Sequence, residues 1–390
     1  MSWSSKDIVD QRTEFVLKSL ERNVVFQELC NEYGISRKTG YKWRQRFVEE
    51  GLAGMHDRSR RPIESPNQLS EGIVCELIKL KLRHLSWGPK KVKALYERVH
   101  GESPSESSVK RVLDKAGLVK RRKRRRSPLG SGRLQSPQAS ESPNDVWTVD
   151  FKGWWLTSGR ERCEPLTIRD DFSRYVLRVE AMTSTKTTPV QQVFEEVFER
   201  YGLPKAIRSD NGTPFASSNG PLGLSRLSAW WVALGIDLDR IEPGHPEQNG
   251  GHERMHLDIR KELQRHIGGG IPEHQAAFDI WRKTFNEVRP HEALSMKTPA
   301  EIYQKSERTY EDCSRDLEYP ANLLPRKINP RGAIKLSGVS YFISQALGGW
   351  TVGMEPLGNE CYAVWFDRLR LAEIDAKTQS VIWTEKEAVS

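Results

Sequence analysis

Apolar residues recur at helical spacing through residues 12–50 and predict three short helices. The second segment, "VVFQELCNEYG", ends at Gly34, and the third, "SRKTGYKWRQRFVEEG", opens with Ser36 as a helix cap and ends at Gly51. A helix, a glycine turn and a second helix with basic side chains are typical of a helix-turn-helix unit. We therefore expect a first DNA-binding domain over residues 1–55, followed by a linker over 56–68.

A second helical unit follows the linker. Two amphipathic stretches are interrupted at "WGPKK", and a third segment begins near Ser105 and ends at Gly117. This pattern predicts a second helix-turn-helix domain over residues 69–119. The cationic run "KRRKRRR" (120–126) and the Ser/Pro/Gly stretch after it predict a basic, flexible linker over 120–143, because seven neighbouring cations repel one another.

The pattern changes at residue 144. Short strand-like runs come first and then alternate with amphipathic helices, which predicts an α/β domain over 144–305. A linker over 306–324 precedes short apolar runs separated by Gly and Asn, and these predict a small β-barrel over 325–390. The whole chain is thus expected to be multidomain: all-α at the front, α/β in the centre and all-β at the end.

Charge is distributed unevenly along the 390 residues, whose net charge is +9. Residues 1–126 contain 29 of the 61 Lys and Arg but only 16 of the 52 acidic residues, which favours a polyanionic partner for the front half. No long apolar run or apolar leader is present, so we expect neither membrane insertion nor secretion. Five scattered cysteines form no C-x-x-C pair and suit a reducing cytoplasm.

Three acidic residues fall where predicted elements end or begin. Asp150 ends the first strand of the α/β domain, Asp210 ends a later strand before the turn pair Asn211-Gly212, and Glu253 lies in the first turn of a helix. Carboxylates gathered at one sheet edge repel one another unless a cation is present. Oxygen ligands without cysteine select Mg²⁺ or Mn²⁺, and paired ions serve phosphodiester displacement. With 52 acidic residues in the chain, spacing alone does not single out this triple.

The same helix also contains H-E-x-x-H, formed by His252, Glu253 and His256, which is a zinc-protease pattern. Such a site requires both histidines well inside a helix and a third protein ligand. Pro246 and Gly250 leave little helix before His252, so we expect that residue at a frayed helix end. A DNA-binding front half also does not suit a protease, and we expect no zinc.

Local motifs carry more information than spacing. In order, the chain contains "VWTVDFKGWW", "AIRSDNGTPF", "GHPEQNGGHERMH" and "NEVRPHEALSMKTPAEIY". Together these closely resemble the DDE transposases of bacterial insertion sequences, which are relatives of retroviral-type integrases. The resemblance covers roughly residues 10–385. The interval between Asp210 and Glu253 is longer than in many retroviral-type members, and residues 216–227 look like the extra material, a loop near the site.

The resemblance implies an RNase H-like core with a mixed five-stranded sheet, in which Asp150, Asp210 and Glu253 hold two Mg²⁺ ions, with Mn²⁺ as a substitute. It implies binding of the terminal inverted repeats of a mobile element, strand cleavage and transfer of the 3′-OH into target DNA. Joining two ends requires a homo-oligomer, at least a dimer on DNA. The implied location is the bacterial cytoplasm, with nucleoid association.

Candidate DNA contacts come from basic and polar residues on the predicted helices and the linker. They are Arg37, Lys38, Lys42, Arg44, Arg46, Ser107, Ser108, Lys110, Arg111, Lys120, Arg121, Arg122, Lys123, Arg124, Arg125, Arg126, His256, Arg260 and Lys261. A solvated helix face is the alternative for each helical set. Asn211 and Gly212 are expected to shape the Asp210 turn, and Asp170 and Asp171 to serve another turn. The alternative for the whole chain is a non-catalytic transcriptional regulator with two helix-turn-helix domains.

Overall fold

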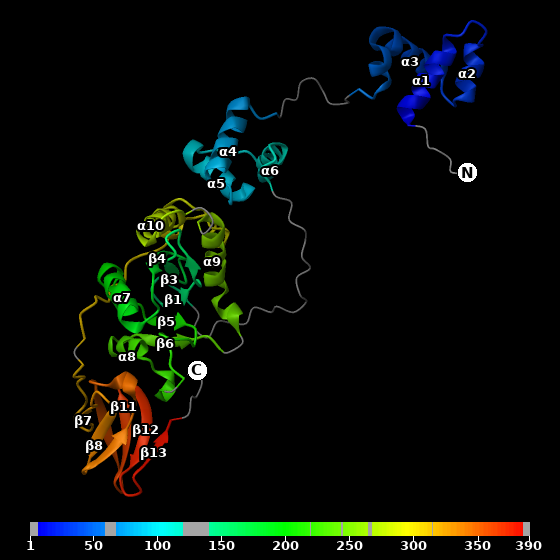
Figure 1. Ribbon diagram of the computed structural model, residues 1–390. Coiled ribbons are helices and arrows are strands. Elements are labelled where there is room, and N and C mark those ends of the chain that lie inside the picture. The colour runs from blue at the N-terminus through cyan, green and yellow to red at the C-terminus, as the bar shows by residue number, and fades with distance from the viewer. Residues whose placement is uncertain are drawn as a thin grey trace. The chain divides into compact units, whose positions relative to one another are not determined.

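The computed structural model describes residues 7–58, 68–119, 140–218, 220–242, 245–263, 267–313 and 315–384 (Figure 1). They fall into two compact units, Met1–Leu69 and Ser70–Ser390, which are described separately. The predicted basic run at 120–126 lies outside the described residues. Within the described residues, no helix is long and apolar enough to cross a membrane.

The first unit consists of three helices around a small aromatic core. They are α1 (Ile8–Ser19), α2 (Phe26–Glu32) and α3 (Arg37–Glu50), followed by a 3-10 turn at Gly51–Met55. Ser36 caps α3 by accepting a hydrogen bond from the Thr39 amide, as its position in the sequence predicts. A Cβ on Gly40 would lie 2.9 Å from Cys30 Sγ, so this glycine allows α2 and α3 to pack closely.

Three further helices open the second unit. They are α4 (Glu71–Arg83), α5 (Pro89–His100) and α6 (Glu106–Lys115). Buried Leu77, Val92 and Leu113 come from the three different helices. Ser105 caps α6 through the amide of Ser108, so α6 begins where the sequence predicts it.

A mixed sheet forms the centre of the second unit. Its main order is β4–β3–β1–β5–β6, and the short β2 (Trp155–Leu156) pairs with the start of β3. The strands are β1 (Val146–Phe151), β3 (Arg162–Asp170), β4 (Val176–Met182), β5 (Ala206–Ser209) and β6 (Asp237–Arg240). β3 pairs antiparallel with β1 and β4, whereas β5 pairs parallel with β1 and β6. This order agrees with the predicted RNase H-like core.

Helices cover both faces of this sheet. One apolar cluster joins Trp147 and Val149 of β1 to α7 (Thr187–Tyr201) and α8 (Arg226–Ala233). A second cluster joins Val176 and Val179 of β4 to α9 (Gly250–Glu262) and α10 (Ile271–Glu287). Because side chains alternate along a strand, Thr148 and Asp150 of β1 lie on the face opposite Trp147 and Val149. The extra segment at 216–227 is partly built into the first cluster, since Leu224 and Leu227 are buried there.

The C-terminal region is an antiparallel sheet with the order β13–β12–β11–β10–β7 and a separate β8–β9 hairpin. Its strands are β7 (Leu324–Lys327), β8 (Ala333–Leu336), β9 (Val339–Phe342), β10 (Thr351–Gly358), β11 (Cys361–Phe366), β12 (Leu369–Asp375) and β13 (Ser380–Trp383). The predicted barrel is not confirmed, because no pairing among the described residues joins β7 to β13. Edge strand β7 contains Pro325, which lacks an amide donor for a further ladder.

Candidate active site

The three candidate acids approach one edge of the central sheet. Asp150 is the penultimate residue of β1, and Asp210 directly follows β5, the parallel neighbour of β1. Parallel neighbours end at the same edge, which places the two aspartates together. Glu253 lies in the first turn of α9, which contacts β1. Asp210 and Glu253 are exposed, whereas Asp150 is partly buried.

Electrostatics supports the proximity of these acids. Burial, followed by the charge of Asp210 and more weakly that of Glu253, raises the pKa of Asp150 to about 7. The Asp150 carboxyl resists ionisation first because it is largely buried and then because two further negative charges lie nearby. The cluster therefore favours either a bound proton or a bound cation.

The turn after β5 directs Asp210 with local hydrogen bonds. The Gly212 amide donates to Asp210 Oδ1 at 3.1 Å, and Asn211 Nδ2 donates to the Ile241 carbonyl at 2.7 Å. A Cβ on Gly212 would lie 3.1 Å from Asp210 Oδ2. Both residues therefore act on the geometry of the turn that holds the carboxylate.

The two histidines of α9 point inward and meet on Thr167. His252 Nε2 lies 2.5 Å and His256 Nε2 2.7 Å from Thr167 Oγ1. His252 Nδ1 lies 2.9 Å from Thr148 Oγ1, and Thr167 Oγ1 donates to the Asp150 carbonyl at 2.9 Å. His256 Nδ1 is 3.8 Å from Asp150 Oδ2. This group of side chains, the threonine–histidine network, joins the helix of Glu253 to the strand of Asp150.

Burial keeps both imidazoles neutral. Burial and then the charges of Lys152 and Arg169 lower the pKa of His256 to about 3. Burial, followed by His256 and Arg169, lowers the pKa of His252 well below its usual value. A buried imidazolium would be costly beside these cations.

The position of His252 differs from the sequence prediction of a frayed helix end. Its side chain is fully buried, because the short 3-10 turn Pro246–Asn249 leads directly into α9 and the imidazole bonds to both β1 and β3. Gly251 allows the Arg169 guanidinium of β3 to pack closely against α9, since a Cβ on Gly251 would lie 2.5 Å from Arg169 Nη2. Both Nε2 atoms contact the same Thr167 hydroxyl.

Side-chain ion pairs hold the C-terminal end of α9, which is the end away from the acids. The Arg289 guanidinium, only 4% exposed, lies 2.6 Å from Asp258 Oδ2 and 3.3 Å from Glu262 Oε1. Trp281 of α10 donates to Glu262 Oε2 at 2.7 Å. Arg289 belongs to the "RPHEAL" segment, which therefore packs against the core and anchors the helix that bears Glu253.

Basic side chains lie on the same elements as the acids or directly after them. Arg260 and Lys261 are exposed on α9. Lys152 is half-buried beside them; burial and then the charge of Arg260 lower its pKa. Arg240, at the end of β6, has a pKa lowered to about 10 by burial, against the opposing attraction of Asp210. Sequence inspection missed Lys152 and Arg240, although each lies within two residues of the end of a strand at this edge.

The candidate DNA contacts on α3 and α6 differ in how exposed their side chains are. Arg37, Lys38 and Lys42 are exposed, whereas Arg44 and Arg46 are half-buried. The Arg46 guanidinium stacks over the Trp43 ring at 4.9 Å, which engages it within its own unit. On α6, Lys110 and Arg111 are exposed, and the hydroxyls of Ser107 and Ser108 contact Ser105 at the helix cap. The candidates at 120–126 lie outside the described residues.

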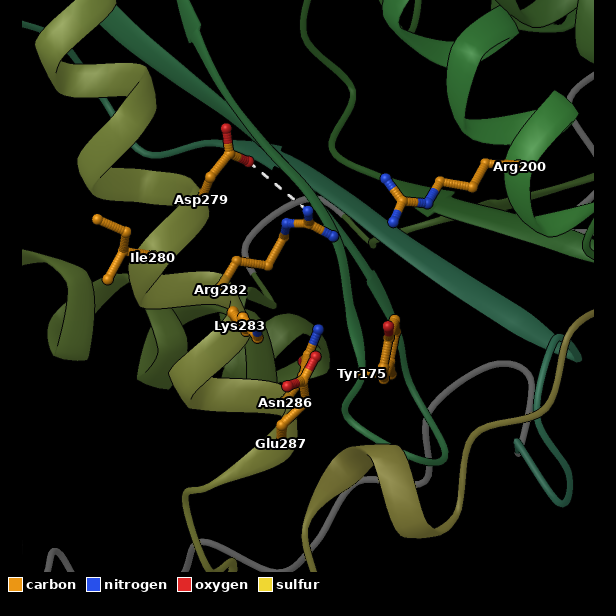
Figure 2. Close-up of a pocket in the computed structure, with 8 residues that line it drawn as sticks. All are labelled: Tyr175, Arg200, Asp279, Ile280, Arg282, Lys283, Asn286 and Glu287. Carbon is orange, nitrogen blue, oxygen red and sulfur yellow. Dashed lines mark ion pairs between the residues drawn. The ribbon is translucent and has the colours of Figure 1, made fainter.

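A cavity of about 430 Å³ lies elsewhere on the core (Figure 2). Its lining comes mainly from α10 and includes Arg200 of α7, Tyr175 beside β4, and the Asp279–Arg282 ion pair at 3.6 Å. None of the three candidate acids lines it, so this cavity is separate from the acidic edge.

Comparisons with known proteins match both the helical front part and the central domain of the chain to known families. Residues 140–246 and 234–299 match two models described as integrase core domain, residues 11–63 match a helix-turn-helix domain, and residues 39–113 match a homeodomain-like domain. The uncharacterized 31.7 kDa protein of insertion element IS407 from Burkholderia multivorans is 30% identical over 245 residues, covering 63% of this chain and 85% of the relative. The chain belongs to the bacterial insertion-sequence transposases of the retroviral integrase superfamily.

A second insertion-sequence relative and a solved structure extend the comparison. The 39.2 kDa protein of insertion element IS476 from Xanthomonas euvesicatoria is 30% identical to this transposase-family chain over 254 residues, covering 64% of the chain and 70% of the relative. The catalytic core domain of HTLV-2 integrase in complex with magnesium aligns at 18% identity with a TM-score of 0.34, covering 43% of the chain and 100% of that domain.

Proposed function

We propose that this chain is a DDE transposase that binds the terminal inverted repeats of a mobile element, cleaves DNA at their ends and joins the 3′-OH to target DNA. The observation that carries the proposal is the convergence of Asp150, Asp210 and Glu253 at one sheet edge. The raised pKa of Asp150 supports it, because the shift arises partly from the other two acids. Family membership supplies the reaction class.

The residues at this edge suit divalent cations. The three carboxylates provide oxygen donors of the kind preferred by Mg²⁺, and their mutual repulsion favours a cation over empty space. We propose that they hold two Mg²⁺ ions, with Mn²⁺ as a substitute. When bound, such ions neutralise charge on the entering and leaving oxygens of a phosphodiester displacement.

Both proposed steps exchange one bond at phosphorus for another. In cleavage, a water oxygen bonds to the phosphorus at the element end while the P–O3′ bond breaks, leaving a 3′-OH on the element and a 5′-phosphate on the flank. In joining, that 3′ oxygen bonds to a target phosphorus, its proton leaves and the target's own 3′ oxygen departs. The in-line geometry is common to both steps, so one set of carboxylates can serve them.

DNA contacts are proposed on three parts of the chain. Exposed Arg37, Lys38 and Lys42 on α3 suit major-groove or phosphate contacts, with Arg44 and Arg46 nearer the core of that unit. Lys110 and Arg111 on α6 form a second set, together with the cationic run at 120–126. Exposed Arg260 and Lys261, in the last turn of α9, suit contacts with DNA phosphates. Joining two element ends requires at least a dimer on DNA.

The deciding experiment uses Glu253→Gln. We expect loss of cleavage and joining by at least about 10³-fold with Mg²⁺ or Mn²⁺, because one of the three charged oxygen donors is removed. Binding to an end fragment in EDTA should stay close to wild type. As the matched control, Glu273→Gln on α10 changes an acid that only caps its own helix and should keep activity.

Two outcomes would contradict the proposal. Cleavage that survives in Glu253→Gln would remove this residue from the site. Specific binding by the wild-type chain without any strand cleavage under either metal would favour a DNA-binding regulator. Neutralising residues 120–126 should weaken binding to all sequences and reduce its salt dependence; an unchanged salt dependence would exclude phosphate contacts there.

A further inference from the structure

A row of polar residues crosses the central sheet on the side where α9 lies. The strand registers align Arg169 of β3, Thr148 of β1, Arg208 of β5 and Asp239 of β6. Residues aligned in this way have their side chains on the same face of the sheet, and the Thr148 hydroxyl contacts His252 of α9 on this face. The two arginines of the row are therefore directed to the face that carries the helix of Glu253.

Asp171, which directly follows β3, links the two arginines. Its Oδ1 lies 2.6 Å from Arg169 Nη2, and its Oδ2 lies 3.3 Å from Arg208 Nη1. Arg208 Nη2 in turn lies 2.7 Å from Asp239 Oδ2. The two guanidinium groups are buried, and buried charges need such partners. Two cations and two anions thus form one connected group, the arginine–aspartate chain: Arg169, Asp171, Arg208 and Asp239.

The arginine–aspartate chain connects the segments that bear two of the candidate acids. At one end, Arg208 lies two residues before Asp210. At the other end, the Arg169 guanidinium packs against Gly251, which lies two residues before Glu253 in the first turn of α9. The carboxylate at the centre of the chain is thus placed to set the separation between β5 and the start of α9.

We propose that Asp171 is a positioning residue for the reaction, which acts through the two arginines to keep Asp210 and Glu253 at the spacing that a pair of divalent cations requires. This rests on the proposed function and adds to it a residue outside the three acids. By sequence, Asp170 and Asp171 were both expected to serve a turn. Asp170 does contact that turn, since its Oδ2 accepts from the Ser173 amide at 2.8 Å, whereas the Asp171 carboxylate is directed to the two arginines.

The test compares Asp171→Asn with the wild-type full chain, well below the melting temperature of the variant. Cleavage of an end fragment at saturating Mg²⁺ should fall by about 10²-fold, the loss that a displacement of about 1 Å can cause. Mn²⁺ affinity, measured by the electron paramagnetic resonance signal of free Mn²⁺, should fall by about 10-fold or more, as when groups that orient metal ligands are removed. In the metal-free chain, amide hydrogen exchange should rise in the first turn of α9 and stay unchanged in its last turn, where Arg289 holds Asp258.

A charge-balanced double variant separates positioning from stability. Asp171→Asn removes one of the two carboxylates that pair with the buried guanidinium groups, and it should lower the melting temperature. Adding Arg169→Met removes the excess positive charge and should restore most of that loss. It does not restore the link to α9, so cleavage and Mn²⁺ affinity should stay low. The double variant also replaces Asp171→Asn if the single variant does not fold.

Glu180→Gln on β4 is the matched control. Glu180 pairs with Arg178, two residues away, at the same 2.6 Å that joins Asp171 to Arg169, and its side chain is 24% exposed against 26% for Asp171. Arg178 also pairs with Glu196 of α7, a helix that bears none of the three acids. Glu180→Gln should therefore leave cleavage, Mn²⁺ affinity and the exchange of α9 unchanged.

The outcomes are distinct. Wild-type Mn²⁺ affinity and wild-type exchange of α9 in Asp171→Asn would overturn the inference. Cleavage that returns together with the melting temperature in the double variant would also overturn it, because Asp171 would then serve stability alone. Glu253→Gln distinguishes the inference from the proposed function. If Glu253→Gln loses cleavage and Mn²⁺ binding while Asp171→Asn keeps both, only the positioning role fails. If neither variant changes either property, the carboxylate site itself is wrong.

Discussion

The two ends of helix α9 are fastened to the core by different chemistry. Its first turn, beside the acids, is held by His252 and Thr167 through neutral hydrogen bonds. Its last turns, away from the acids, are held by the Arg289 guanidinium between Asp258 and Glu262. Both anchors are buried, and both connect α9 to segments distant in the chain.

The difference follows from what surrounds each end. A guanidinium between the helix and Asp150 would neutralise the carboxylate and compete with the proposed cation. Neutral imidazole and hydroxyl groups fix the backbone at the near end, and the Arg169 guanidinium that packs against Gly251 there is paired with Asp171 at 2.6 Å. At the far end no such competition exists, so an ion pair can serve as the anchor. The comparison predicts that substitutions at the C-terminal end of α9 affect mainly stability. Substitutions at its N-terminal end should also affect metal binding.

The largest effect on stability is expected from Arg289→Ala. Removing the arginine takes the nearest cation from Asp258, whose other cationic partner Arg254 is 3.9 Å away, and also removes the pairing with Glu262, which should lower the free energy of unfolding by about 3–5 kcal/mol. Denaturant unfolding followed by circular dichroism measures this. The exposed pair Lys327–Asp316 provides the comparison, since Lys327→Ala should cost less than about 1 kcal/mol.

A neutralised triple variant sharpens the same prediction. Arg289→Met with Asp258→Asn and Glu262→Gln removes the charges together and should recover most of the stability lost by Arg289→Ala. Equal losses in the single and triple variants would mean that packing of the arginine, and not its charge, anchors this end.

A smaller loss is expected from His252→Leu at the near end. It leaves the Thr148 and Thr167 hydroxyls without one partner each, which should cost about 1–3 kcal/mol of unfolding free energy. Adding Thr148→Val removes a hydroxyl that has lost its imidazole partner and keeps only the longer bond to the Arg169 carbonyl at 3.3 Å, and it should return part of that loss. Strictly additive effects in this double-mutant cycle would argue against a direct Thr148–His252 bond.

The sequence predicts which strand ends and which helix bear the three acids. It does not predict the hydrogen bonds that hold these elements together. Asp150, Asp210 and Glu253 are predicted as the site because each ends, follows or opens a predicted element within a recognisable motif. Thr148 and Asp150 alternate with Trp147 and Val149 along β1, so their shared face was readable in principle. Their pairing with Thr167 was not, because it depends on the register of β1 against β3.

Two departures from the sequence predictions have physical causes. The burial of His252 was missed because glycines and a proline before it suggested fraying, whereas Gly251 instead admits Arg169 close to the helix. The C-terminal strands were predicted, but their closure into a barrel is not confirmed. Closure depends on pairing between the two edge strands, which the alternation of apolar and polar residues does not predict. The anchoring role of Arg289 likewise depends on a contact 31 residues away, with Asp258.

The last expected change is a pH-dependent change in stability, which tests the acidic edge itself. The folded pKa of Asp150 is about 7, above its unfolded value of about 3.9, so folding takes up a proton between these values. The associated stability is present below about pH 4 and is lost as the pH rises to about 7. In EDTA, Asp150→Asn should therefore melt a few degrees above wild type at pH 8 and lose that advantage near pH 4. At pH 8, Mg²⁺ should raise the melting temperature of wild type more than that of the variant, because only wild type retains the repulsion that a cation relieves. Equal melting temperatures in EDTA at both pH values would mean that neither burial nor the neighbouring acids raise the pKa of Asp150.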